Sequence, residues 1–460
     1  MKFDINEIKN MRNVYFIAPA GCGKTETITD IVGAKSESKK YLILTHTNAG
    51  VKCIHDRLIK KNIPLNQCNI STIASFCYKY VNAYPKLSKK ENIDKKDYNA
   101  TYIGMDNLLK NKTIQNILRA SYSQILIDEY QDCTELQHNF IVSLSKIVPC
   151  KLFGDPLQGI FDFKDNLVDW NTLCNDFEYA GTFDFPWRWE NHNRELGKWI
   201  MQIRKKLINS EEIFLNDLPS CVEVITDDEA RSSLIHKAFE LLKNKNGNLI
   251  LFQYPNQAYK FSQMMKGCYF CQEEIECKSL RDIASIIKSN TILAIYEMAK
   301  LCFTKFSEEL GTIYKKVKDK NYNFNRITKN KDIAELTKKA LQDKNYYYNI
   351  IEKIEQNQQM KLYRKELWNE FKKVLREYKL NPNKDINEII DEIRNNSSLS
   401  NKYKYKNLVS RVLLVKGLEF DTVVVVNPEE LTKKLFYVAI SRPTDKLIIV
   451  SKKLKLTFKN

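Results

Sequence analysis

The chain has 460 residues, of which 43% are hydrophobic and 28% charged, a globular balance with enough length for two or three domains with full cores. No apolar run reaches the ~18 residues that a membrane span needs, and the acidic residues near the N-terminus lead us to expect no signal peptide. We therefore expect a cytoplasmic protein without a membrane partner, whose twelve scattered cysteines are reduced thiols. The net charge of +17 favours a polyanionic partner such as nucleic acid, although a generally lysine-rich proteome would give the same charge.

The first strong pattern is a glycine-rich turn between a predicted strand and a predicted helix. Apolar residues 14–18 predict a short buried strand, and residues 26–32 predict the start of a helix. Strand, glycine-rich turn, Gly-Lys-Thr and helix make up the P-loop arrangement, in which backbone N–H groups and the helix N-terminus surround a phosphate. The residues expected to bind the nucleotide are Ala18, Pro19, Ala20, Gly21, Cys22, Gly23, Lys24 and Thr25.

Two side chains of this turn have predicted chemical roles. Lys24 would supply a positive charge for the β- and γ-phosphates, and the Thr25 hydroxyl suits Mg²⁺. Ala18 stands where the motif usually has its first glycine, which is a mild departure for a tight turn. The alternative interpretation is a chance glycine-rich turn, which the flanking strand and helix disfavour.

Two further predicted strands end in polar turns. One covers residues 40–45, and the other begins at residue 69 and ends in a Ser/Thr turn. Ligands of open α/β sheets bind at the carboxyl ends of the strands, so these turns are candidate binding segments. From about residue 78 to residue 120 the sequence becomes rich in Lys and Tyr with helical stretches, which predicts an inserted helical subdomain.

The second strong pattern, at residues 124–132, is a predicted buried strand that ends in two adjacent acids. Asp128 can hold Mg²⁺ through water, and Glu129 can orient and deprotonate an attacking water. Two adjacent acids at the end of an apolar strand are costly to bury without a cation. The alternative is a strand end followed by a solvated acidic turn.

Two later segments also predict contacts with the nucleotide. Gln158 follows a predicted strand and is placed to touch a γ-phosphate, whereas Phe161 and Phe163 suit either a core or stacking on a base. In the segment 185–190, Arg188 would reach a γ-phosphate and Trp187 would lie on an adenine ring. The alternative for this segment is a packing cluster whose arginine reaches solvent.

A second α/β region follows, with predicted strands at residues 221–225 and 247–252 and again from residue 411. Between them, residues 267–402 predict one helical insertion. Its tyrosine run at residues 346–348 suits either a seam between helices or stacking on nucleic acid. Cys268 and Cys271 have zinc-like spacing, but no second pair completes a usual zinc site. Arg442, at a predicted helix end, is a second candidate for contact with the γ-phosphate.

In order, these motifs resemble the UvrD/Rep class of superfamily 1 helicases. The motifs are Gly-Lys-Thr, Thr-His-Thr-Asn, Asp-Glu-Tyr-Gln-Asp, Gly-Asp-Pro-Leu-Gln, Trp-Arg, Lys-Gly-Leu-Glu and Tyr-Val-Ala-Ile-Ser-Arg. The resemblance runs from about residue 14 to residue 450 and leaves out the insertions. It implies an α/β protein with two RecA-like P-loop NTPase domains, each with a parallel sheet and a mainly helical insertion. Its implied activity is ATP-driven movement, 3′ to 5′, on single-stranded DNA.

The resemblance also implies domain boundaries. Residues 1–77 and 121–184 would form the first RecA-like domain, and residues 78–120 its helical insertion. Residues 185–266 and 403–460 would form the second RecA-like domain, and residues 267–402 its insertion.

By matching motif position, the resemblance implies roles for single residues. It gives Lys24, Thr25 and Asp128 to the phosphates and Mg²⁺, and Glu129 to the water. The γ-phosphate would be contacted by Gln158 and by two arginine fingers, Arg188 and Arg442. Trp187 would stack on adenine and Glu419 would contact the ribose. The residues that fall where the family touches single-stranded DNA are Thr45, His46, Asn48, Thr72 and Phe163.

The chain departs from the family pattern in three places. No Gln stands among residues 1–13, where the family has a Gln that reads adenine, so we expect relaxed adenine specificity. Two polar groups of the family near the DNA path are absent from residues 411–417, which predicts altered coupling to DNA. His46 replaces a family Phe and can still stack on a base.

The chain is also compact for this class, and it resembles the helicase subunit of Gabija-type anti-phage systems, which works with a partner nuclease–ATPase. The main hypothesis is an ATP-dependent DNA translocase or helicase that acts on single-stranded DNA or on DNA with single-stranded ends. The alternatives are an ATP-controlled subunit that senses DNA or regulates a nuclease, and an RNA-directed helicase.

Overall fold

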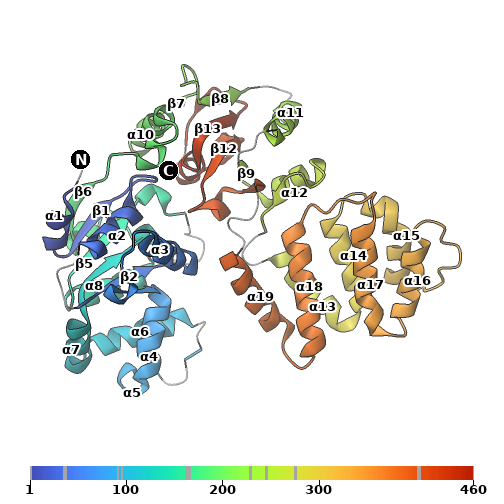
Figure 1. Ribbon diagram of the computed structural model, residues 1–460, viewed down its shortest axis with the longest axis horizontal. Helices are drawn as coiled ribbons and strands as arrows, with labels where there is room; N and C mark the ends of the chain where they lie inside the picture. Colours follow the sequence, from blue (N-terminus) through green and yellow to red (C-terminus); the bar gives the residue numbers. More distant parts are fainter. Residues whose placement is uncertain are drawn as a thin grey trace. The chain divides into compact units, whose positions relative to one another are not determined.

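The structure is a computed structural model that describes residues 3–34, 39–90, 93–94, 97–160, 167–226, 230–243, 247–273, 277–400 and 406–458 (Figure 1). Contacts divide the chain into two compact units. The first contains Met1–Val222, Leu431–Asp445 and Lys455–Asn460, and the second contains Glu223–Glu430 and Lys446–Leu454. This division groups residues 185–222 with the first sheet, whereas the resemblance assigns them to the second RecA-like domain. The predicted domain boundaries stay a prediction.

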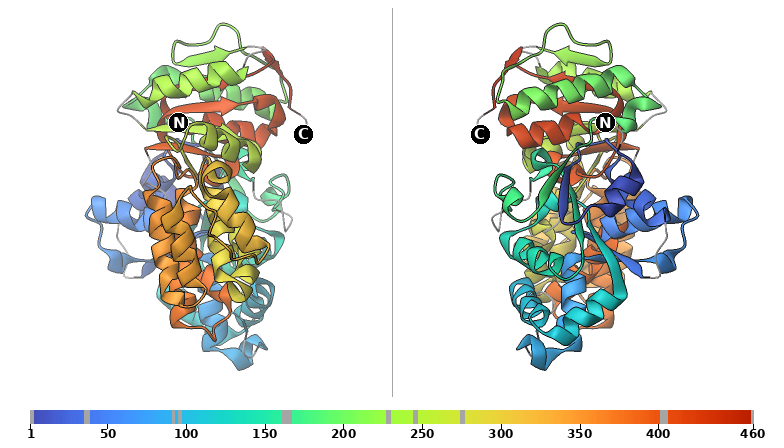
Figure 2. Two further views of the ribbon diagram at one scale, coloured as in Figure 1. Left: turned by 90° about the vertical axis from the view of Figure 1, so that its right-hand side faces the viewer. Right: turned by 90° about the vertical axis from the view of Figure 1, so that its left-hand side faces the viewer.

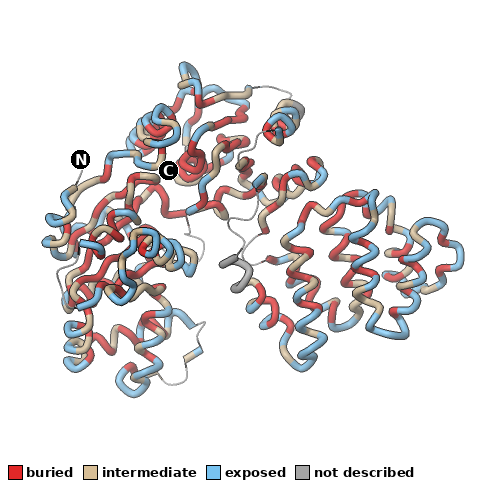
Figure 3. The backbone as a smooth tube through the Cα atoms, viewed as in Figure 1, coloured by how far each residue is buried: buried red, intermediate tan, exposed pale blue. Residues whose placement is uncertain are grey.

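The first sheet is parallel, with six strands in the order β3-β2-β4-β5-β1-β6. Its strands are β1 (Val14–Ile17), β2 (Lys40–Thr45), β3 (Cys68–Thr72), β4 (Tyr122–Ile127), β5 (Cys150–Gly154) and β6 (Glu178–Thr182). Along β2, Leu42 and Leu44 face one core and Tyr41 and Ile43 face the other, because successive strand side chains point to opposite faces. Both faces of the sheet are therefore covered, which explains why its strands have continuous apolar sequences (Figure 3).

Helices and short turns connect these strands. The helices of the first unit are α1 (Ile5–Asn10), α2 (Lys24–Gly33), α3 (Asn48–Lys60), α4 (Ile73–Ala83), α5 (Pro85–Ser88), α6 (Tyr98–Leu109), α7 (Lys112–Ser121), α8 (Glu135–Ser145), α9 (Trp187–Glu190), α10 (Arg194–Ile208) and α20 (Lys433–Ile440). Its 3-10 turns are η1 (Leu65–Gln67), η2 (Tyr130–Asp132), η3 (Pro156–Gln158) and η4 (Leu173–Asn175). A small antiparallel pair joins β7 (Ile213–Phe214) to β14 (Lys455–Leu456). The described part of the predicted insertion at residues 78–120 is thus helical, as expected.

The second sheet also has six strands, in the order β10-β11-β9-β12-β13-β8. Its strands are β8 (Val222–Ile225), β9 (Asn248–Phe252), β10 (Phe270–Cys271), β11 (Asn407–Arg411), β12 (Phe420–Val426) and β13 (Pro443–Val450). The pairings of β10 with β11, β11 with β9 and β9 with β12 are parallel. Near it lie α11 (Ala230–Leu242), α12 (Pro255–Met264), η6 (Val412–Val415) and η7 (Pro428–Glu430). Two such sheets with flanking helices confirm the predicted α/β class with two RecA-like domains.

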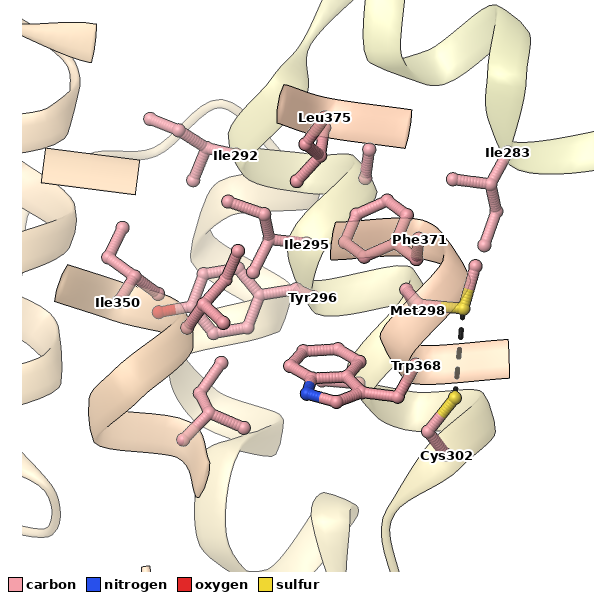
Figure 4. Packing of buried hydrophobic residues seen from close by; sticks show 14 of the residues in the cluster. Ile283, Ile292, Ile295, Tyr296, Met298, Cys302, Ile350, Trp368, Phe371 and Leu375 are labelled. Carbon is pink, nitrogen blue, oxygen red and sulfur yellow. Dashed lines mark hydrogen bonds between the residues drawn. The ribbon is translucent and has the colours of Figure 1, made fainter. Parts of the chain in front are cut away.

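Between β10 and β11, the described residues form seven helices and one short turn, and Figure 2 shows this helical part of the chain. They are α13 (Lys278–Ser289), α14 (Thr291–Cys302), α15 (Phe306–Lys318), α16 (Lys331–Ala340), η5 (Lys344–Tyr346), α17 (Tyr347–Gln356), α18 (Lys365–Leu380) and α19 (Ile386–Ser400). Figure 4 shows their common core, in which Trp368 and Phe371 of α18 lie beside Tyr296 and Met298 of α14. The predicted second helical insertion is therefore a packed helical body with its own core.

The tyrosine run at residues 346–348 lies against this core. Tyr346, Tyr347 and Tyr348 are all partly buried and pack against the buried cluster. The ammonium of Lys379 lies 5.6 Å from the centre of the Tyr348 ring, a cation–π arrangement. The structure therefore gives these tyrosines a packing role, and their predicted contact with nucleic acid stays a prediction.

Two other expectations concern cysteines and membranes. None of the twelve cysteines, all of which are among the described residues, forms a disulfide bond, and most are buried. Among the described residues, we find no helix with the length and hydropathy that a membrane crossing requires.

The buried carboxyl group of Glu366, in the first turn of α18, makes the stability of the second unit depend on pH. Burial, followed by the neighbouring carboxylate of Glu370, raises the pKa of Glu366 to about 7, although Arg394 opposes this shift. Because the folded state favours protonated Glu366, the free energy of unfolding should fall as pH rises from about 4.5 to about 7.

We expect Glu366→Gln to weaken this pH dependence and to stabilise the protein at pH 8 by about 2–3 kcal/mol. Urea denaturation at pH 5 and at pH 8 measures the effect. Glu377→Gln, at an exposed position of the same helix, is the control. If Glu366→Gln followed the wild-type pH dependence, the burial argument would be wrong.

Candidate active site

The glycine-rich turn has the geometry of a P-loop. It follows β1 directly, and α2 begins at Lys24 (Figure 1). Gly23, just before the helix, has a φ of +87°, and Gly21 has a φ of +72°, both in the left-handed region that favours glycine. A Cβ on Gly23 would also lie 3.0 Å from the Trp187 ring. The sequence therefore has glycine where the backbone and a close neighbour both require it.

The remaining residues of the turn are tied to the structure around it. The N–H of Ala18 donates to the carbonyl of the last residue of β5 at 2.7 Å, and that of Cys22 donates to the Pro19 carbonyl at 3.2 Å. The N–H of Ala20 donates to the hydroxyl of Tyr437 at 3.1 Å. Tyr437 is fully buried in α20 and was not among the predicted site residues, although its segment was one of the recognised motifs.

Lys24 faces the two predicted catalytic acids. Its Nζ contacts Oε1 of Glu129 and lies 3.4 Å from Oδ1 of Asp128. Burial alone would lower the pKa of Lys24, but the two carboxylates outweigh it and raise this pKa above its usual range. Lys24 is therefore a protonated cation that bridges the P-loop and the end of β4.

The acids occupy the turn that follows β4. The N–H of Asp128 donates to the Leu44 carbonyl of β2 at 2.9 Å, so both strand ends lie at the same edge of the sheet. Glu129 has a φ of +57°, which is uncommon for a residue with a side chain, and its N–H donates to Oδ1 of Asp128 at 2.9 Å. Burial raises the pKa of Asp128, and Lys24 opposes this shift. The turn thus presents the Glu129 carboxylate to Lys24.

The charges of this cluster suit a magnesium ion. One ammonium faces two carboxylates, which leaves a negative charge in a largely buried place. Thr25 follows Lys24 as the second residue of α2, and carboxylate and hydroxyl oxygens are the ligands that Mg²⁺ prefers. Among the described residues no three His, Cys, Asp or Glu side chains gather as a metal site. Mg²⁺ commonly completes its shell with water and phosphate oxygens, so two protein ligands suffice.

Gln158 is held by a buried ion pair that the sequence analysis missed. Its Nε2 donates to Oδ2 of Asp155 at 3.2 Å, and Nη2 of Arg204 donates to Oδ1 of Asp155 at 2.8 Å. Asp155 is fully buried and Arg204 nearly so. Arg204 lies in α10 among apolar side chains, and a cation on the apolar face of an amphipathic helix was the only sequence signal for it.

Gln131, also missed, joins the turn after β4 to the turn after β5. Its Nε2 donates to Oε2 of Glu129, and its Oε1 accepts the N–H of Asp155 at 3.1 Å. The residue is 1% exposed. Gln131 stands inside the recognised Asp-Glu-Tyr-Gln-Asp motif, so its position was visible in the sequence but its partners were not.

The two predicted arginine fingers meet at one residue. Nη1 of Arg188 donates to the Ser441 carbonyl at 2.6 Å, and Nη2 of Arg442 donates to the Ser441 hydroxyl at 2.7 Å. The backbone N–H of Arg188 also donates to the Gly21 carbonyl at 3.0 Å, which places it directly against the P-loop. Arg442 is 2% exposed, and its Nε donates to the Val438 carbonyl at 2.9 Å. Both arginines therefore belong to the same unit as the P-loop.

The predicted base and ribose contacts differ in exposure and location. Trp187 is 47% exposed beside Gly23, and its ring centre lies 4.3 Å from that of exposed Phe185. An exposed aromatic pair next to a phosphate-binding turn can stack on a base. Glu419 is exposed just before β12, in the second unit.

The predicted DNA contacts lie largely where two neighbouring strands end. Thr45 and Thr72 are paired residues at the ends of β2 and β3, and the Thr72 hydroxyl caps α4 by accepting the Ser75 N–H at 3.1 Å. His46 follows Thr45 and its Nε2 lies 3.4 Å from the Cys133 thiol. The remaining predicted DNA contacts are Asn48, exposed at the start of α3, and Phe163, which lies outside the described residues together with Phe161.

Residues 4–164 match the family model described as an AAA domain. The segment contains the P-loop, the acidic pair and Gln158. The chain is 29% identical, over 31% of its length, to an ATP-dependent helicase/nuclease subunit of Lactococcus lactis subsp. cremoris (strain SK11). It is 30% identical, over 29% of its length, to the exonuclease/helicase subunit RexA of strain MG1363 of that subspecies. The matching segments span 12% and 11% of these relatives.

Solved structures show weaker likenesses. An arterivirus nonstructural protein 10 (helicase) in complex with DNA has a TM-score of 0.37 and 9% identity, covering 95% of this chain and 60% of the viral one. The Pif1 helicase of Candida albicans has a TM-score of 0.33 and 13% identity, covering 57% of this chain and 52% of that one. TM-scores this low support no argument. The sequence matches agree with the predicted resemblance to superfamily 1 helicases.

Proposed function

We propose that this chain is a superfamily 1 motor of the UvrD/Rep type, which hydrolyses ATP and moves 3′ to 5′ on single-stranded DNA. The observation that carries the proposal is the cluster in which Lys24, at the start of α2, contacts both Asp128 and Glu129. The AAA-domain match over residues 4–164 supports nucleotide use, and the helicase names of the relatives support a DNA substrate.

Each residue of the cluster has a chemical task in this proposal. Lys24 binds the β- and γ-phosphates and exchanges its carboxylate partners for phosphate oxygens. Glu129, released from that ion pair, accepts a proton from the attacking water. Gln158 contacts the γ-phosphate, while Arg188 and Arg442 stabilise the negative charge of the transition state. Mg²⁺, held through Thr25 and Asp128, supplies charge neutralisation for the phosphates when bound.

The proposed DNA path uses the strand ends next to this cluster. Thr45 and His46 follow β2, whose Leu44 carbonyl accepts the N–H of Asp128 at 2.9 Å. A change in the backbone of this segment would therefore act directly on the turn that carries the acids. The net charge of +17 adds a general attraction to the phosphates of DNA.

The first test is the ATPase rate of the purified chain with and without single-stranded DNA. We expect DNA to stimulate hydrolysis. The DNA concentration for half-maximal stimulation should rise at least about tenfold when salt increases from about 50 to about 200 mM, because phosphate contacts release counterions. An ATPase indifferent to DNA would contradict the motor proposal.

A second candidate is an ATP-controlled subunit that senses DNA or regulates a nuclease without processive unwinding, as in a Gabija-type defence complex. The helicase/nuclease names of the relatives favour this candidate. Residues 412–415 also favour it, because they are apolar where the family has polar groups near the DNA path. A duplex-unwinding assay separates the two, because only the motor should displace a strand. Pull-down from the source cell, followed by a nuclease assay, would identify the partner of the second.

A further inference from the structure

Gln131 connects the proposed catalytic base to the proposed γ-phosphate contact. Its side-chain amide donates to Oε2 of Glu129 and accepts the backbone N–H of Asp155 at 3.1 Å. Asp155 in turn accepts the Nε2 group of Gln158 at 3.2 Å. A continuous row of hydrogen bonds therefore runs from the base to the residue that would touch the γ-phosphate.

The other oxygen of the base has a different partner. Oε1 of Glu129 contacts Nζ of Lys24, and Oε2 contacts Gln131. If ATP binds as proposed, phosphate oxygens take over Lys24, whereas the contact with Gln131 involves no group that the nucleotide uses. Gln131 can therefore hold Glu129 in place at the moment when Lys24 releases it.

The residue that faces Gln131 on β5 leaves room for this arrangement. A Cβ on Gly154 would lie 2.7 Å from Oε1 of Gln131 and 2.9 Å from the Trp170 ring, both closer than real Cβ contacts. Gly154 has no positive φ, so backbone conformation does not explain the glycine. The space that it leaves is occupied by the amide of Gln131.

We propose that Gln131 is a positioning residue, which fixes the Glu129 carboxylate toward the attacking water and ties its orientation to Asp155. The proposal rests on the proposed ATPase function. Hydrogen bonds that orient a catalytic group act on the rate of the chemical step, since small displacements of a base lower the rate strongly. Gln131 should therefore affect kcat far more than the binding of the nucleotide.

The decisive variant is Gln131→Met, which keeps the length of the side chain and removes both hydrogen bonds. We expect kcat for ATP hydrolysis to fall about 10–100-fold. The KM for ATP and the Kd for a fluorescent ADP should change less than about threefold, because the residue touches no phosphate ligand. Steady-state kinetics and equilibrium titration give the three values.

Gln124→Met is the matched control. Gln124 lies on β4 and, like Gln131, is buried with a side-chain amide that both donates and accepts a hydrogen bond. It donates to the Lys9 carbonyl at 2.7 Å and accepts from the Lys151 ammonium at 2.8 Å. It lies outside the proposed site, so this variant reports the cost of losing a buried amide. We expect both variants to have a similarly lowered Tm and only Gln131→Met to have the large loss of kcat.

Gly154→Ala tests the same contact without changing Gln131. The added methyl group would lie too close to both the amide oxygen and the Trp170 ring, so the amide must shift and kcat should again fall while the Kd for ADP stays near the wild-type value. This variant decides the question if Gln131→Met does not fold.

Three results would overturn the inference. One is an unchanged kcat in Gln131→Met or, where that variant does not fold, in Gly154→Ala. Another is a kcat loss matched by an equal loss of nucleotide binding, and the third is a Gln124→Met variant that loses kcat equally. A wild-type chain without ATPase activity, or a Glu129→Gln variant with wild-type turnover, would instead refute the proposed function itself.

Discussion

Glu129→Gln is expected to lower kcat for ATP hydrolysis by about 10²–10⁴-fold while the chain still binds ATP. The substitution keeps the shape of the side chain and removes the carboxylate that would accept the proton. It also removes one of the two carboxylates that face Lys24, so the cation is freer to bind phosphate and ATP affinity should not fall. Phosphate release at saturating ATP and titration with a fluorescent nucleotide measure the two effects.

Two further variants serve as controls for this result. Glu135→Gln, an exposed position at the start of α8, should keep wild-type turnover. Lys24→Ala should lose both turnover and nucleotide affinity, because the cation proposed to bind the phosphates is gone. Wild-type turnover in Glu129→Gln would show that Glu129 is not the catalytic base. The proton acceptor would then be Asp128 or water alone.

Arg364→Leu is expected to destabilise the second unit by about 3–5 kcal/mol. Nε and Nη2 of Arg364 donate to the two oxygens of Glu273 at 2.8 and 2.6 Å, and its guanidinium lies 4.1 Å from the centre of the Tyr259 ring. Arg364 is 4% exposed and Glu273 is 3% exposed. The substitution would leave a carboxylate buried without its cation, which costs more than the pair itself contributes.

Urea denaturation followed by far-UV circular dichroism measures this loss. Arg281→Leu is the control, because its ion pair with Asp391 is considerably more exposed and should contribute at most about 1 kcal/mol. The double variant Arg364→Leu/Glu273→Leu should recover much of the stability, since neither charge remains buried. An equal loss in Arg281→Leu and Arg364→Leu would show that burial of the pair does not matter.

The parts of the site that follow from local sequence were predictable. The P-loop needs a strand, a turn of small residues and a helix within about twenty positions, and all three signals lie between residues 14 and 32. The acids at positions 128 and 129 stand out because charged residues rarely end an apolar strand without a partner. The ends of β2 and β4 meet because the carboxyl ends of neighbouring parallel strands share one edge of the sheet.

The contacts that hold the site together were not predictable, because they join residues far apart in the chain. Arg204 meets Asp155 across 49 positions, and Ala20 meets Tyr437 across 417 positions. A single sequence shows an arginine in an amphipathic helix and a tyrosine in a motif, but not which side chains they meet. The tyrosines at residues 346–348 show that a conspicuous sequence pattern need not mark a binding site, because these three side chains pack against a hydrophobic core.

The first unit is discontinuous in sequence, and this has a consequence for biosynthesis. Leu431–Asp445 belongs to the first unit, although the whole described helical body and most of the second sheet precede it in the chain. A ribosome therefore releases the P-loop about 400 residues before the helix whose tyrosine bonds to it. The nascent first sheet must persist without α20 while a second body folds in between. Completion of the proposed nucleotide site is thus among the last events of folding, so a prematurely terminated chain would carry a P-loop without Arg442.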